Sequence, residues 1–183
     1  MAIVSAAEDI DEPTRWALAA RQGDSQAEAA FVRATQAEVW RFVAALVDPG
    51  SADDLTQETY LRAFRALPQF EGRSSVRTWL LGIAKRTCAD HLRSLVRQRR
   101  LSLRLAAVSD ADHSPDPAGH VHAAQLLATL SPERRAPFVL TQMLGLTYEQ
   151  AATALDVPVG TIRSRVARAR ADLVADLVTA LAA

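Results

Sequence analysis

Six polar residues near the C-terminus have side chains of the kind that read nucleic acid. At 100° per residue, the apolar residues of the predicted last helix share one face, and the polar ones point away from it or flank it. Arginine binds phosphates and guanine edges, and hydroxyl groups bind either. The polar residues are Thr161, Arg163, Ser164, Arg165, Arg168 and Arg170, and the apolar ones are Val159, Ile162, Val166, Ala169, Leu173 and Leu177. A solvated surface helix is the alternative interpretation.

The segment before this helix predicts the first half of a helix-turn-helix. Thr147 is a good N-cap for a helix over residues 148–155, and the small residues Ala151 and Ala152 permit close helix crossing. Asp156-Val157-Pro158 then makes a tight turn. Because the second helix of this motif enters the major groove, the six polar residues would lie near base edges and phosphates.

A second cluster combines acids with amides. A helix is predicted to begin after Ser51, its N-cap, with Asp53 and Asp54 in the first turn. Gln57 and Glu58 follow on the next turn of the same helix, and such a face suits an arginine-rich protein partner. The alternative for the two aspartates is that they only complement the helix dipole.

Basic residues are concentrated between these two clusters. The 183-residue chain has 21 lysines and arginines and 21 acids, and its net charge of zero argues against a uniformly basic nucleic-acid binder. Residues 59–105 nevertheless hold eleven basic residues against two acids, and residues 158–183 hold four against two. Residues 1–58 carry four arginines against eleven acids, and residues 106–157 carry two against six. The chain therefore alternates acidic and basic segments.

The periodicity of the chain predicts an all-α fold. Nearly every segment has helical spacing of its apolar residues, and none has the alternation of a strand. Two small helical domains, residues 1–97 and 119–183, are predicted on either side of a flexible linker. The linker, residues 98–118, is rich in proline, acids and small residues.

Within the first domain, one long helix is predicted from Ser74 or Ser75, as its cap, to about Leu95. The tryptophans Trp16 and Trp40 are predicted to lie in the core. Trp79 is assigned to the core rather than to base stacking, because a tryptophan at apolar spacing is usually buried.

Several classes of site are disfavoured. Cys88 is the only cysteine, which excludes an internal disulfide, and it is expected to be a small buried hydrophobe. His113, His120 and His122 lie near one another without an acid or cysteine at metal-ligand spacing, so neither a metal nor a cofactor is predicted. No catalytic triad, phosphate loop, secretory signal or membrane-spanning run is visible, and we expect a non-enzymatic cytoplasmic protein.

Four stretches of the chain resemble the extracytoplasmic-function (ECF) sigma factors, group IV of the sigma-70 family. Residues 53–64 and 70–84 resemble sigma region 2, and residues 130–134 and 160–170 resemble sigma region 4 with its helix-turn-helix. The motifs follow the order of the family, and the linker stands where other classes carry a further domain. The resemblance implies a bacterial protein that binds core RNA polymerase, directs it to promoter DNA and helps to open the duplex.

The resemblance also implies roles for individual residues. The polymerase-binding helix is matched by Asp53, Asp54, Gln57, Glu58 and Arg62. Residues 70–75 match the loop that captures an extruded base of the −10 element, and the −10 set comprises Phe70, Gly72, Arg73, Ser74, Ser75, Arg77, Lys85, Arg86 and Arg93. Arg163, Ser164, Arg165 and Arg168 match positions that enter the −35 groove, with Thr161 and Arg170 beside them. An anti-sigma factor is a further implied partner.

Two other functions fit parts of the sequence. A helix-turn-helix activator that is not a polymerase subunit should carry a receiver or sensing domain in front, whereas the front segment here is helical throughout. A helical module that binds only protein is the third interpretation.

The linker gives a geometric expectation. About 20 residues span roughly 25 Å as a relaxed coil and about 65 Å when extended, whereas promoter elements two DNA turns apart are roughly 70 Å from each other. We therefore expect compact or variable domain spacing in the free protein, and a stretched arrangement only on polymerase.

Overall fold

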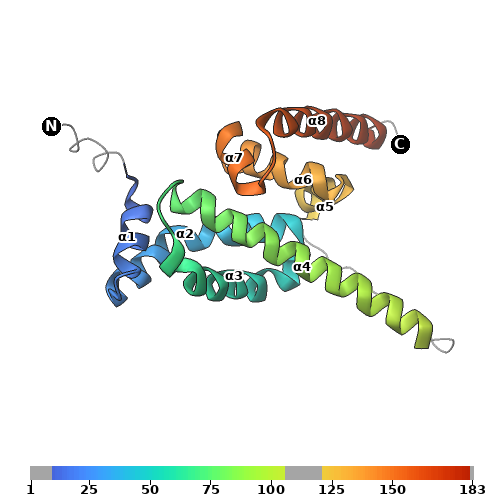
Figure 1. Ribbon diagram of the computed structural model, residues 1–183. Coiled ribbons are helices and arrows are strands. Elements are labelled where there is room, and N and C mark those ends of the chain that lie inside the picture. The colour runs from blue at the N-terminus through green and yellow to red at the C-terminus, as the bar shows by residue number, and fades with distance from the viewer. Residues whose placement is uncertain (1–9, 106–120, 182–183) are drawn as a thin grey trace.

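The computed structural model describes residues 10–105 and 121–181, and every regular element among them is helical, as predicted (Figure 1). Short 3₁₀ turns at Pro49–Ser51 and Leu67–Gln69 and a π-helical turn at Val139–Met143 join some of the helices. The helices are α1 (Glu12–Ala20), α2 (Ser25–Leu46), α3 (Ala52–Ala66), α4 (Val76–Leu105), α5 (Val121–Thr129), α6 (Pro132–Phe138), α7 (Tyr148–Leu155) and α8 (Val159–Leu181). None of the helices in the described ranges is long and apolar enough to cross a bilayer.

Aspartate side chains cap the N-termini of the first two helices. The Asp11 carboxylate accepts from the Thr14 N–H at 2.8 Å, and Asp24 accepts from the N–H groups of Gln26 and Ala27. Each bond satisfies a donor that the first helical turn leaves unpaired.

Ser51 occupies the N-cap position of α3, as predicted, but its side chain makes no cap hydrogen bond. The Asp48 carboxylate accepts from both the N–H and the hydroxyl of Ser51, at 3.0 and 2.8 Å, so the hydroxyl is used before α3 begins. Asp48 precedes Pro49 and forms the local side-chain-to-backbone bond that aspartate favours at turns.

The N-terminal helices share a core of aromatic and aliphatic side chains. Phe31 and Phe42 of α2 and Leu80 of α4 are fully buried. Phe31 makes edge-on contacts with Tyr60 and Phe64 of α3 at centroid distances of 6.0 and 6.2 Å. The Tyr60 hydroxyl bonds to the Thr35 hydroxyl at 2.6 Å, which supplies the partner that a buried phenol needs.

The prediction that Trp16 and Trp40 lie in the core is wrong. Trp16 is 37% exposed and Trp40 is 40% exposed, whereas Trp79 packs against the core as predicted. Alanines such as Ala17 and Ala27 fill the contact between α1 and α2, so the Trp16 ring lies at the surface, whereas Trp40 lies beside α3, where its indole bonds to Asp53.

Helix α4 is longer than predicted. It continues past Leu95 to Leu105, eight residues into the segment expected as a linker, and Figure 1 shows its C-terminal part projecting beyond the other helices. Residues 96–105 consist of arginine, leucine, glutamine, valine and serine, without glycine or proline, so nothing in them ends the helix. The remainder of the expected linker lies outside the described residues, as do His113 and His120 and the side chain of His122.

The C-terminal helices have a separate group of buried residues. Leu130, Leu140, Ile162 and Val166 are almost fully buried, which confirms the apolar face predicted for the first turns of α8. Farther along, Leu177 is 44% exposed, contrary to prediction, because α8 extends beyond the helices on which it packs.

Cys88 is buried in α4, and burial raises the pKa of its thiol from 9.0 to about 12. A protonated, inaccessible thiol is a poor nucleophile, so the structure favours the packing role over a redox switch.

This burial makes stability fall at high pH. The unfolded chain loses the thiol proton above pH 9.0, whereas the folded protein keeps it to about pH 12, so the folded state binds more protons in that window. We expect Cys88→Ala to remove a slope of up to about 1.4 kcal/mol per pH unit, measured by urea unfolding between pH 8 and 11. If the free energy of unfolding changed with pH in parallel for the two proteins, burial would not raise the pKa of the thiol, and the prediction would be wrong.

Candidate nucleic-acid and protein interfaces

The predicted acid and amide face of α3 is solvent-accessible at its N-terminal end. Asp53, Asp54 and Gln57 are exposed, while Leu55 and Thr56 turn into the core. Trp40 of α2 donates its indole N–H to Asp53 at 2.7 Å. An aromatic surface from α2 therefore borders the acids, which the sequence separation of thirteen residues did not suggest.

Arg62, predicted on the same face, binds within the protein. Its guanidinium donates to Glu58 and to Asp90 of α4, both at 2.7 Å, and Arg93 donates to Asp90 at 2.5 Å. The bonds from Arg62 and then Arg93 lower the pKa of the Asp90 carboxyl, and the bonds to Glu58 and Asp90 raise the pKa of Arg62. This network ties α3 to α4, and no feature of the sequence indicates that Asp90 is its centre.

The loop at residues 70–75 joins the 3₁₀ turn after α3 to α4. Phe70 is buried, and its ring lies 4.9 Å from Trp79 between centroids. Glu71, Gly72 and Arg73 are exposed, and Gly72 has a φ of +71°, a conformation that favours glycine. Of the predicted −10 residues in the loop, Phe70 thus anchors it, while Gly72 and Arg73 face solvent.

Ser75, rather than Ser74, forms the cap at the start of α4. Its hydroxyl accepts from the Thr78 N–H at 3.2 Å and bonds to the Thr78 hydroxyl at 3.0 Å. Ser74 is half-buried beside it. The cap fixes where the loop ends and the basic helix begins.

Helices α7 and α8 form the predicted helix-turn-helix. Thr147 and Gln150 make a reciprocal capping box, with bonds of 3.2 and 2.9 Å. Ala151 and Ala152 are buried, as predicted. Asp156 ends α7 in a left-handed conformation, φ 55°, and the Val157 N–H bonds back to the Ala152 carbonyl at 3.1 Å. This C-terminal cap of α7 sets the direction in which the chain enters α8.

The polar face of α8 is presented outward, with two of its residues held by neighbours. Arg163, Ser164 and Arg168 are exposed, and Thr161 is half-buried. Arg165 pairs with Glu133 of α6 at 3.5 Å, and Arg170 donates to Gln142 at 2.5 Å. The six predicted residues therefore lie along one helix, but two of them have alternative partners within the protein.

The C-terminal helices lie directly on α4. A Cβ added at Gly82 would come 2.9 Å from the Ala154 carbonyl oxygen of α7, so the two helices touch through backbone. Arg77 donates to the Leu144 carbonyl, and its Nε lies 2.8 Å from both carboxylate oxygens of Glu38. The described helices of the two groups are thus packed together, which is the compact one of the two arrangements expected for the free protein.

A second arginine joins the same two groups of helices. Arg135 of α6 donates to the Leu46 carbonyl at the end of α2 at 3.4 Å, and to the Ala128 and Leu130 carbonyls at 2.7 and 2.9 Å. Burial lowers the pKa of Arg135, yet arginine stays charged. Its charge therefore faces three carbonyl oxygens, including the unpaired C-terminal end of α2.

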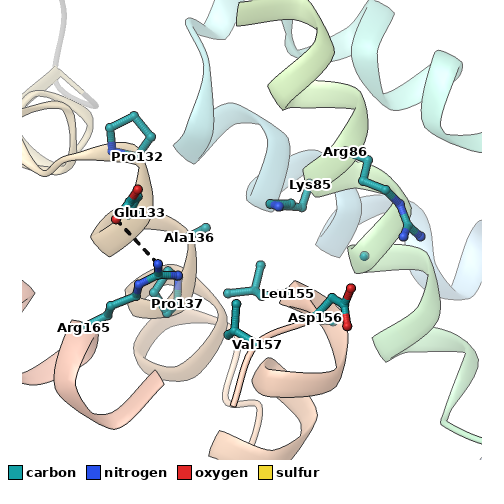
Figure 2. Close-up of a pocket in the computed structure, with 12 residues that line it drawn as sticks. Lys85, Arg86, Pro132, Glu133, Ala136, Pro137, Leu155, Asp156, Val157 and Arg165 are labelled. Carbon is teal, nitrogen blue, oxygen red and sulfur yellow. Dashed lines mark ion pairs between the residues drawn. The ribbon is translucent and has the colours of Figure 1, made fainter. Parts of the chain in front are cut away.

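Between α4 and the helix-turn-helix lies a cleft of about 480 Å³ (Figure 2). Lys85 and Arg86 line it on α4, and Glu133, Asp156 and Arg165 line the opposite wall. Predicted −10 and −35 residues, far apart in the sequence, thus face one cleft. The sequence did not predict this meeting, because it depends on how the two groups of helices pack.

Both parts of the chain match known families. Residues 31–98 match Sigma-70 region 2, and residues 123–173 match Sigma-70, region 4. The ECF RNA polymerase sigma factor SigC of Mycobacterium tuberculosis is 49% identical over 178 residues, which is 95% of this chain and 96% of that protein. This chain belongs to the ECF sigma factors of the sigma-70 family.

Solved sigma factors have the same arrangement of helices. CnrH in complex with the cytosolic domain of CnrY is 25% identical, with a TM-score of 0.72 over 92% of this ECF chain and 99% of that one. RpoE in complex with the anti-sigma factor NepR, from Bartonella quintana, is 27% identical, with a TM-score of 0.61 over 78% and 91% of the two chains. The helices of regions 2 and 4 are therefore those of the family.

The contact at Gly82 makes domain closure testable. Gly82→Ala should separate α4 from α7, because the new methyl group collides with backbone that cannot rotate away. Gly160→Ala is the matched control: both glycines are helical, but nothing lies within 4 Å of a Cβ at Gly160.

We expect a larger radius of gyration by small-angle scattering for Gly82→Ala only. Both substitutions add about 1 kcal/mol of helix propensity, so equal dimensions for both variants would contradict the tight contact.

Proposed function

We propose that this ECF sigma factor initiates transcription by binding core RNA polymerase through α3, the −10 element through the loop at residues 70–75 and α4, and the −35 element through α8. It acts without catalysis of its own, in the bacterial cytoplasm. The observation that carries the proposal is that a region 2 unit with an exposed acidic helix and a region 4 unit with an outward polar recognition helix occur in one chain.

The polymerase contact rests on Asp53, Asp54, Gln57 and Glu58. Three of them are exposed, and Glu58 is half-buried in its pair with Arg62. Arginine side chains on the polymerase would bond to these carboxylates and the amide. Arg62 then acts by holding Glu58 and α4 in place rather than by direct contact.

The −10 contact rests on the exposed loop and on the basic side of α4. Gly72 and Arg73 are available to an extruded base and its phosphate, with Ser74 beside them in the loop, and the set continues along α4 with Arg77, Lys85, Arg86 and Arg93. Buried Phe70 and the capping Ser75 support this set from the two ends of the loop.

The packing of the region 4 helices against α4, which we call the closed arrangement, restricts when DNA can bind. Arg77 donates to Leu144, and Lys85 and Arg86 face the helix-turn-helix across the cleft. Because these cations cannot contact region 4 and promoter DNA at once, the two units must separate before both elements are bound. Polymerase, which binds the acidic face of α3 on another surface, would hold the separated form.

An anti-sigma factor is the partner we propose for the free protein. Both solved sigma factors compared above are in complexes, CnrH with CnrY and RpoE with an anti-sigma factor. A partner bound to the closed arrangement would compete with polymerase and with DNA.

In-vitro transcription with core polymerase tests the proposal. The wild type should give promoter-specific transcripts, and Asp54→Arg should lose core binding because it reverses a charge on the docking face. Sequence-specific binding by the free protein with no transcript upon addition of core would instead support an activator.

Arg165 and Arg170 should differ in how they contribute to −35 recognition. We expect Arg165→Ala to relax selectivity at one −35 position by about 1–3 kcal/mol, because Arg165 is one of the residues proposed to enter the −35 groove and its pair with Glu133 is long. Arg170→Ala should weaken binding to all sequences alike and lower the salt dependence by about one phosphate contact. Binding assays on a −35 library with reconstituted holoenzyme give both quantities, and equal losses with unchanged preferences would refute the assignment.

A further inference from the structure

The two ends of the exposed loop are held by one helix from outside the matched family regions. Helix α1, residues Glu12–Ala20, precedes the region 2 match, which begins at residue 31. It packs against α2 and also contacts α4. Two of its side chains reach the loop, one at each end.

At the first end, Arg21 holds the backbone of Phe70. The guanidinium of Arg21, the residue that caps the C-terminus of α1, donates to the Phe70 carbonyl at 2.7 Å. The Phe70 ring is buried against Trp79, so both the side chain and the carbonyl of this residue are fixed. The first residue of the loop is therefore fixed in position where the loop follows the 3₁₀ turn.

At the second end, Thr14 holds the backbone of Val76. The Val76 N–H, at the first residue of α4, donates to the Thr14 hydroxyl at 2.9 Å. Both residues are buried, with Thr14 4% exposed and Val76 fully enclosed. Water therefore cannot replace the hydroxyl, and its loss would leave a buried N–H unpaired.

Between these ends the side-chain bonds are local. Glu71 pairs with Arg73 at 3.0 Å on the surface, and Ser75 bonds to Thr78 within the α4 cap. Such an exposed pair contributes little to order. The position of the exposed segment is therefore set largely by where its two ends are held.

We propose that Thr14 and Arg21 are positioning residues for base capture by the −10 loop. The inference rests on the proposed role of residues 70–75. Capture of an extruded base requires a loop that is already ordered, because any conformational freedom of the free loop is lost, at a cost in entropy, when the base binds. Helix α1 supplies that restraint without touching DNA.

The test uses holoenzyme and a promoter whose −10 segment is already unpaired. Abasic substitutions along the non-template strand identify the base whose removal weakens wild-type binding. Thr14→Val keeps the side-chain shape and removes the acceptor, Thr14→Ser restores it, and Arg21→Met keeps a long side chain without a donor. Arg15→Met, an exposed arginine of the same helix, is the matched control.

We expect Thr14→Val to bind intact DNA roughly five- to thirty-fold more weakly than the wild type, the range of one lost buried hydrogen bond. Arg21→Met should weaken binding in the same way but by a smaller factor, because the bond from Arg21 is only partly buried. On abasic DNA this loss should vanish, since nothing remains to be captured. Thr14→Ser and Arg15→Met should behave as the wild type, and core binding should be unchanged in every variant.

The outcomes separate the two proposals. If no abasic position weakens the wild type, base capture itself is refuted. If one does, but the variants lose equal affinity for intact and abasic DNA, the loss is general and the positioning role is refuted. Arg21 is exposed, so Arg21→Met decides the question even if Thr14→Val does not fold.

Discussion

The backbone contact between α4 and α7 governs the arrangement of the candidate DNA-binding surfaces. Gly82 permits it, because any side chain there would meet the Ala154 carbonyl. On its other sides α4 packs against α2 and α3, and it begins at the loop of residues 70–75. The same helix thus supports the region 2 core, carries the basic residues and receives region 4 (Figure 1).

The balance of charges has a structural meaning in this arrangement. Arg62, Arg77 and Arg165 all bond to carboxylates within the protein, at Glu58 and Asp90, Glu38 and Glu133 respectively. A net charge of zero is therefore the sum of basic surfaces and of acids placed close to them. These pairs are partly solvent-exposed, and a phosphate can compete for such an arginine at modest cost. For Arg77 and Arg165, which we propose to contact DNA, these internal carboxylates are partners that a phosphate could replace.

Helix α1, which precedes the region 2 match, contributes to the proposed base-capture site. Its alanines pack tightly against α2, and its polar residues Thr14 and Arg21 fix the ends of the loop. Base capture would then depend on residues that have no contact with the DNA. Such dependence is common where a site must be rigid before the ligand arrives.

The sequence by itself determined the helices, most caps, the helix-turn-helix and the polar faces of α3 and α8, because these follow from propensity and periodicity within a few turns. It placed Trp16 and Trp40 in the core, because periodicity does not say which apolar residue a neighbouring helix covers. It also ended α4 ten residues early, although residues 96–105 contain no glycine or proline. Only the tertiary structure decided that Arg62 of α3 meets Asp90 of α4, that Thr14 meets Val76, and that Lys85 faces Arg165 across a cleft. Each of these meetings joins different helices, and their partners are set by packing rather than by spacing along the chain.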